Sequence, residues 1–139
     1  LTENEILTYE SLFYEKKIKL KYNIKKNIKY TCNSDLIRQL LGILIDNSIK
    51  HTNENGNVTV NLYKSNKDII LEVKNDGDEI KKEDEQKIFE RFYKIDESRN
   101  RNENRYGLGL AIAKDIVEKH NAKISANSKK GITTFKVTF

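Results

Sequence analysis

The chain has 139 residues, of which 37% are hydrophobic and 34% charged, and its formal net charge is +5. This length suits one domain with one sizeable core. The longest apolar run, LLGILI, is far shorter than the roughly 20 residues that span a membrane, and LTENEILTYE has no signal-like features. A single cysteine, Cys32, cannot form an internal disulfide, so we expect a reducing compartment.

The basic residues are spread along the chain, apart from KYNIKKNIK at 21–29 and the arginines Arg99, Arg101 and Arg105. A nucleic-acid binder usually concentrates positive charge on one face or in one run. We therefore expect a solvated basic surface and no nucleic-acid partner. A polyanionic small molecule such as a nucleotide remains a compatible ligand.

The first third of the chain predicts a helix, strands and a long helix. Residues 4–17 have helical apolar spacing, and IKLKYNI at 18–24 alternates like a strand with one buried face. Residues 28–32 alternate in the same way. Ser34 is a suitable N-cap for a helix over 35–51.

A β-hairpin is predicted next. The Asn55-Gly56 turn leads into an alternating strand at 58–62, and a turn at 65–67 leads into a second strand at 69–73.

The remainder predicts two helices, a loop and two strands. EDEQKIFERFYK at 83–94 predicts a short helix, and 95–105 predicts a mobile loop because it is poor in apolar residues. YGLGLAIAKDIVEKH at 106–120 predicts a helix that ends near Asn121. Two alternating strands close the chain, at 124–126 and 135–139. This order predicts an α/β (α+β) two-layer sandwich, in which helices cover one face of a mixed, mainly antiparallel sheet.

The helix at 35–51 turns polar near its end, in LLGILIDNSIKH. Ile43, Asn47, Lys50 and His51 share one stripe, because residues three and four apart are neighbours on a helix. An Asn carbonyl oxygen suits Mg²⁺, and a Lys one turn away can neutralise phosphate charge. The stripe is therefore either an exposed polar helix end or a site for phosphate and a metal ion.

Two glycine motifs are compatible with the same chemistry. Gly107 and Gly109 open an apolar helix, where free N–H groups can bind an anion, although a tight helix start explains them equally well. In VKNDGDEI, Gly77 suits a backbone conformation that other residues avoid, and Asn75 and Asp76 could hydrogen-bond a heterocycle. That stretch also has the composition of an ordinary turn.

In their order and spacing, these motifs resemble the boxes of the catalytic, ATP-binding domain of bacterial sensor histidine kinases. Such domains have the Bergerat ATP-binding fold and share a superfamily with gyrase, MutL and the heat-shock chaperones. LLGILIDNSIKHTNENGNV resembles the N box, VKNDGDEI the G1 box and YGLGLAIAKDIVEKHNAKI the G2 box. IFERFYK, whose Phe89 we expect in the core, resembles the F box and favours the sensor kinases, and GITTFKVTF resembles the closing turn and strand. The resemblance covers nearly all of the chain after Leu20.

The resemblance implies a role for each matched residue. Asn47 and Lys50 would be the catalytic pair, because Asn47 would coordinate Mg²⁺ on ATP and Lys50 would contact phosphate. His51 would line the nucleotide, and Asn75 stands where an Asp usually accepts a hydrogen bond from adenine. The other implied nucleotide contacts are Gly77, Ile80, Lys94, Arg105, Gly107, Leu108, Gly109 and Thr133.

Three positions depart from the family's pattern. Ile43 stands where a second polar residue is common, and Glu79 and Arg105 each replace a glycine. A polar group at 43 could support metal and phosphate, and charge-assisted contacts of that kind are worth roughly 1.5–3 kcal/mol each. We therefore expect weaker ATP binding or slower transfer, which Arg105 would partly offset as a cation in the lid.

The resemblance also implies the reaction and the partners. The γ-phosphoryl group of ATP would pass to a histidine on a separate helical dimerisation domain, through positioning and charge neutralisation. Residues 1–17 would lead from that domain, and 18–139, with an ATP lid at 94–106, would form the catalytic domain. The full-length protein would be a membrane-bound homodimer that keeps this domain in the cytoplasm and signals to a response regulator.

Only two histidines are present, and neither resembles a phosphoacceptor, because His51 falls in the implied ATP site and His120 near a helix end. The isolated chain is therefore predicted to bind ATP without phosphorylating itself. The alternative is a degenerate ATP-binding regulatory or interaction module of the same superfamily. A DNA-binding domain would instead show salt-dependent DNA affinity and no effect of ATP.

Overall fold

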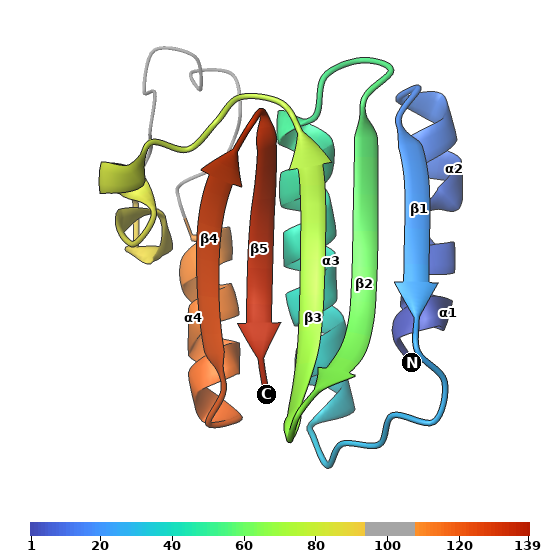
Figure 1. The fold of residues 1–139 in the computed structure, drawn as a ribbon, viewed down its shortest axis with the longest axis vertical. Helices are drawn as coiled ribbons and strands as arrows, with labels where there is room; N and C mark the ends of the chain where they lie inside the picture. Colours follow the sequence, from blue (N-terminus) through green and yellow to red (C-terminus); the bar gives the residue numbers. More distant parts are fainter. Residues whose placement is uncertain (94–107) are drawn as a thin grey trace.

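Five strands form one sheet in the described part of the computed structural model, which comprises residues 1–93 and 108–139. The strand order is β1-β2-β3-β5-β4 (Figure 1). β1 pairs with β2 in parallel, and the other three pairs are antiparallel. The strands are β1 (Lys19–Ile24), β2 (Asn57–Ser65), β3 (Asp68–Asp76), β4 (Lys123–Lys129) and β5 (Ile132–Thr138). The predicted mixed, mainly antiparallel sheet is confirmed.

Helices cover one face of this sheet, as predicted (Figure 1). They are α1 (Thr2–Leu7), α2 (Glu10–Glu15), α3 (Ser34–His51) and α4 (Gly109–Lys119). The first two lie beside β1 and bury Ile6 and Phe13 in the same core as the rest of the chain. In the described residues, no helix combines the length and the apolarity needed to cross a membrane.

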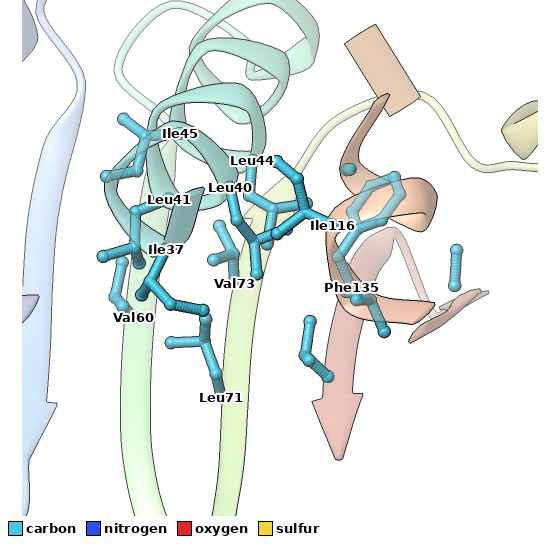
Figure 2. Close-up of a cluster of buried hydrophobic side chains, with 14 of the residues drawn as sticks. Ile37, Leu40, Leu41, Leu44, Ile45, Val60, Leu71, Val73, Ile116 and Phe135 are labelled. Atoms are coloured by element: carbon cyan, nitrogen blue, oxygen red, sulfur yellow. The ribbon is translucent and has the colours of Figure 1, made fainter. Parts of the chain in front are cut away.

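The core lies between α3, α4 and the sheet (Figure 2). The helical period of α3 turns one apolar face to the sheet, formed by Ile37, Leu40, Leu41, Leu44 and Ile45. The two-residue period of the central strands supplies the facing layer, with Val60, Leu71, Val73 and Phe135. This packing fixes α3 against the sheet and so fixes where its polar end lies.

Two differences from the predicted elements lie before α3. The helix predicted at 4–17 is divided into α1 and α2, because the Thr8 hydroxyl and N–H both bond to the Glu5 carbonyl and end the first helix. The strand predicted at 28–32 is absent from the described residues. There the Tyr30 hydroxyl donates to the His120 carbonyl oxygen, and the Tyr30 ring packs 4.9 Å from the Phe139 ring. Side chains, instead of strand pairing, attach this connection to the sheet.

Two further predictions, both about helices, are corrected. The N-cap of α3 is Asn33 in place of Ser34, because the Asn33 side chain accepts a hydrogen bond from the Leu36 N–H. The helix predicted at 83–94 is replaced by two 3₁₀ turns, η1 (Lys82–Asp84) and η2 (Lys87–Phe89).

The contact between Tyr93 and Asp84 explains why this segment does not form one continuous helix. The Tyr93 hydroxyl donates back to the buried carboxylate of Asp84. A continuous helix would separate the two residues by about 13 Å along its axis. Folding the segment back on itself keeps the Asp84 carboxylate hydrogen-bonded.

Candidate functional site

The polar end of α3 and the turn after β3 meet at one end of the central strands (Figure 1). Thr52, which caps α3, forms an isolated β-bridge with Gly77. Gly77 has φ +150°, and a Cβ atom there would lie 2.0 Å from the His51 carbonyl oxygen. Only a residue without a Cβ allows this approach. The helix end and the turn at 75–80, here called the G1 turn, therefore form one continuous surface.

The last turns of α3, just before that contact, carry several polar side chains. Ser48 faces the core, where its hydroxyl donates to the carbonyls of Leu44 and Ile45. Asn47 and Lys50 are half-buried, and His51 is exposed. Within the described residues, the Asn47 side chain makes no hydrogen bond, so its carbonyl oxygen is available to a cation.

The start of α4 lies against the same stretch of α3. A Cβ atom on Gly109 would lie 3.7 Å from Cγ2 of Ile43, which is one turn before Asn47. Leu108 is the N-cap and makes no side-chain capping bond, and the first turn of α4 contains no acidic residue. Among the described residues, no N-cap or first-turn side chain accepts from the first N–H groups of α4, and a helix start of this kind can bind an anion.

Asn75 and Thr133 are buried side by side at the end of the central strands. They are direct partners across β3 and β5, with exposed fractions of only 2% and 3%. Asn75 Nδ2 lies 3.2 Å from the Asp76 carbonyl oxygen, and an atom so placed must be a donor. The side-chain oxygen of Asn75 is therefore turned the other way.

That oxygen, Asn75 Oδ1, keeps access to solvent. It makes no hydrogen bond within the described residues, although every side-chain nitrogen or oxygen that is sealed from solvent there has a partner. This open acceptor at a buried position can accept a hydrogen bond from the N–H donor of a ligand.

Hydrogen bonds link Thr133 to the G1 turn. The Thr133 hydroxyl lies 2.7 Å from the Ser128 hydroxyl and 3.4 Å from the Asp78 carbonyl oxygen. Ser128 in turn accepts from the N–H of Ile80, at 2.7 Å. Ile80 is half-buried and packs against the core. The sequence analysis overlooked Ser128, since a single Ser near a hairpin turn gives no signal of its own.

The IFERFYK segment is anchored on two sides. Phe89 is in the core as predicted, edge-on to Phe135 with ring centroids 6.2 Å apart. The hydrogen bond to Asp84, together with burial and nearby carboxylates, raises the pKa of Tyr93 above its ordinary value. Arg91 bonds to Asp115 of α4 at 3.1 Å. Between these anchors, Phe92 is 68% exposed.

The structure thus brings together most of the predicted site residues. The end of the central strands holds Asn75, Gly77, Ile80 and Thr133. The last turn of α3 meets it where His51 contacts Gly77, with Asn47 and Lys50 just before that contact, and the start of α4 adds Leu108 and Gly109 beside Ile43. The predicted residues Lys94, Arg105 and Gly107, and the lid predicted at 94–106, lie outside the described residues.

Residues 32–139 match the family described as histidine kinase-, DNA gyrase B- and HSP90-like ATPases. The chain belongs to this ATPase family. Within it, the chain is 39% identical over 116 residues to the signal transduction histidine-protein kinase ArlS of Staphylococcus haemolyticus, covering 83% of the chain and 26% of ArlS. It is 35% identical over 135 residues to the heme sensor protein HssS of Staphylococcus aureus, covering 96% of the chain and 29% of HssS.

The fold agrees with membership of this ATPase family. The catalytic domain of histidine kinase ThkA superposes with a TM-score of 0.87 at 22% identity, over 99% of this chain and 90% of that one. The predicted resemblance and fold class are therefore confirmed. The chain spans less than a third of the length of ArlS and HssS, so the activity and partners of a longer protein are a matter for proposal.

Proposed function

We propose that the chain is the ATP–Mg²⁺-binding catalytic domain of a sensor histidine kinase, which transfers the γ-phosphoryl group of ATP to a histidine on a separate dimerisation helix. The observation that carries this proposal is the contact of Gly77 with His51, which joins the polar end of α3 to the G1 turn. Membership of the ATPase family supports the choice of ATP.

The described residues fit ATP and Mg²⁺ by their chemistry. Asn75 Oδ1 is an open acceptor at a buried position, and Thr133 and Gly77 shape the turn around it. Asn47 offers a carbonyl oxygen of the hard type that Mg²⁺ prefers, and Lys50 places a positive charge one turn away. The start of α4, at Leu108 and Gly109, offers N–H groups to an anion.

In this proposal, the chain's own residues bind, orient and neutralise charge. Bound Mg²⁺ would supply charge neutralisation on the phosphates. Lys50 and the α4 N–H groups would stabilise negative charge on the phosphate oxygens, while Asn75 fixes the base at the other end. No protein nucleophile is required, because phosphoryl transfer depends mainly on positioning and electrostatics.

The test is calorimetric titration with a non-hydrolysable ATP analogue, with and without Mg²⁺. Asn47→Ala should abolish most of the Mg²⁺-dependent part of the affinity and leave the Mg²⁺-independent part. Gln39→Ala, which removes an exposed amide from the same helix far from its polar end, should change neither. Mg²⁺-dependent affinity that is unaltered in Asn47→Ala contradicts the metal assignment.

A second candidate is a nucleotide-binding regulatory module without efficient kinase activity. The observation that favours it is Ile43, an apolar side chain against Gly109 at the start of α4. The two candidates differ when a helical phosphoacceptor domain from a sensor kinase is added with labelled ATP. A kinase domain labels the histidine of that domain, and a regulatory module binds ATP without labelling it.

The proposed partners follow from the sensor-kinase relatives. We infer that this chain works with the helical dimerisation and phosphoacceptor domain of a longer homodimeric protein. Through that domain it would signal to a response regulator. In this proposal the chain is the cytoplasmic part of a membrane-anchored protein, and 1–17 leads from the dimerisation domain. Fusion of the dimerisation domain before Leu1 should give a dimer that phosphorylates itself.

A further inference from the structure

The G1 turn is bonded to the β4–β5 turn through both backbone groups of Gly131. The Gly77 N–H donates to the Gly131 carbonyl oxygen at 3.2 Å. The Gly131 N–H donates to the side-chain carboxylate of Glu79 at 2.8 Å. These two bonds run in opposite directions between the same two turns, so each limits the movement that the other permits.

A third bond fixes the far end of the G1 turn. The Ile80 N–H donates to the Ser128 hydroxyl, which itself pairs with Thr133. Together the three bonds, which we call the Glu79 clamp, hold the segment at Gly77, Glu79 and Ile80. Asn75, whose amide oxygen is the open acceptor, lies two residues before Gly77, where this held segment begins.

Glu79 is the member of the clamp that can be tested on its own. The other two bonds use the backbone N–H groups of Gly77 and Ile80, whereas Glu79 contributes a side chain. That side chain is exposed, and exposed charged groups usually contribute little to global stability. An effect of Glu79 on ligand binding can therefore be separated from an effect on folding.

We propose that Glu79 is a positioning residue, which holds the G1 turn in its nucleotide-accepting geometry before the nucleotide binds. The inference rests on the proposed function, because it concerns affinity for the same nucleotide. When only part of a population has a binding-competent turn, the apparent dissociation constant rises in inverse proportion to that fraction. A carboxylate that holds the turn therefore raises affinity without touching the ligand.

The experiment compares the unaltered chain with three variants. Glu79→Ala removes the acceptor, and Glu79→Gln keeps an oxygen acceptor without the charge. Glu83→Ala removes an equivalent charge from the exposed surface of η1. Amide hydrogen exchange at Gly131 is measured without nucleotide, affinity is measured with Mg²⁺ and a non-hydrolysable ATP analogue, and stability by thermal denaturation.

We expect Glu79→Ala to weaken the affinity about threefold to tenfold, the range that corresponds to one hydrogen bond, and to speed exchange at Gly131. Glu79→Gln and Glu83→Ala should stay within about twofold of the unaltered chain on both measurements. Unchanged affinity in Glu79→Ala overturns the inference, as does exchange that accelerates throughout the sheet with a large fall in melting temperature. An unaltered chain that binds no nucleotide overturns the proposed function, while exchange at Gly131 still reports on the clamp.

Discussion

Gly77 and His51 are in such close contact that residue 77 has no room for a side chain: a Cβ atom would lie 2.0 Å from the His51 carbonyl oxygen. The two residues come from different motifs, and their contact sets the distance between the end of α3 and the G1 turn. Steric exclusion at one position therefore determines how two parts of the site fit together.

Gly77→Ala should destabilise the fold by more than about 2 kcal/mol, because the new methyl group meets backbone atoms and the residue has a positive φ. Gly131→Ala is the matched control, since Gly131 also has a positive φ, +77°, but no atom lies within 4 Å of its Cβ position. It should cost only about 1–2 kcal/mol of backbone strain. Urea denaturation measures both, and equal losses would contradict the steric argument.

Ile43→Asn should strengthen Mg²⁺-dependent binding of ATP. The new amide would lie one turn before Asn47 and beside Gly109, where it can support a metal-bound phosphate. One added hydrogen bond of about 1 kcal/mol corresponds to roughly fivefold in affinity. Ile49→Asn makes the same replacement at another half-buried position of α3 and should give no gain. Calorimetry measures the ATP affinity of both variants. Equal changes at both positions would show that residue 43 does not contribute to the site.

Asn75 should select the purine by its group at position 6. ATP presents an amino donor there, which suits the open Asn75 Oδ1, whereas inosine triphosphate presents an oxygen acceptor. Turning the amide to suit that oxygen breaks the bond to the Asp76 carbonyl, so we expect ATP to bind about tenfold more tightly. Asn75→Ala should bring the two affinities close together. A preference that persists in Asn75→Ala assigns the selection to another group.

Asn75→Asp is a separate test, because it introduces the residue usual in related kinases. The second carboxylate oxygen would face the Asp76 carbonyl oxygen, at the position where Nδ2 now donates. Two acceptors then oppose each other at a buried site. ATP affinity and thermal stability should both fall, and a tighter complex would show that the amide orientation is not what this turn requires.

Tyr93 should make stability depend on alkaline pH. Its hydrogen bond to Asp84 raises its pKa above the ordinary value of 10.0. A pKa that is higher in the folded state means that the stabilisation is complete below the unfolded value and is lost as the pH rises through the folded value. Tyr93→Phe should lower stability at pH 8 and flatten its decline above pH 10. Tyr14→Phe, at an 88% exposed position, is the control in urea denaturation across that range.

The isolated chain should incorporate no phosphate at His120. The ring bonds to the Ile116 carbonyl through Nδ1 and accepts from the Asn33 N–H through Nε2. Both nitrogens that could attack a phosphoryl group are therefore engaged, Nδ1 with the last turns of α4 and Nε2 with the N-cap of α3. Incubation with labelled ATP, followed by acid-labile phosphate mapping, checks this, and label on His120 would contradict it.

Regular patterns made the fold largely predictable from the sequence. Helical periodicity predicted the long helix that the structure shows as α3, and alternation in β2 and β3 identified their buried faces. The alternation of 28–32 was misleading. It places the Tyr30 ring against the Phe139 ring, but the segment does not pair with a neighbouring strand. Local periodicity predicts which side chains are buried, but it does not predict which other part of the chain covers them.

The site was predictable only where a residue type is tied to its chemistry. Gly77 could be selected as a tight turn, which its φ of +150° confirms, and Asn47 as a metal ligand stays a prediction. Ser128 and the Glu79 clamp could not be predicted, since they depend on bonds between segments distant in sequence. Glu79 appeared as a departure from a pattern, and only its contact with Gly131 gives it a structural role.

The pairing of Asn75 with Thr133 also bears on how the protein folds. β2 and β3 are joined by a short turn and can form early, whereas β3 must wait for β5, which is far along the chain. The end of the site that we propose binds the base is therefore assembled by the slow, non-local pairing. Nucleotide should leave the early folding steps unaffected and act only on the completed sheet, where it would slow unfolding.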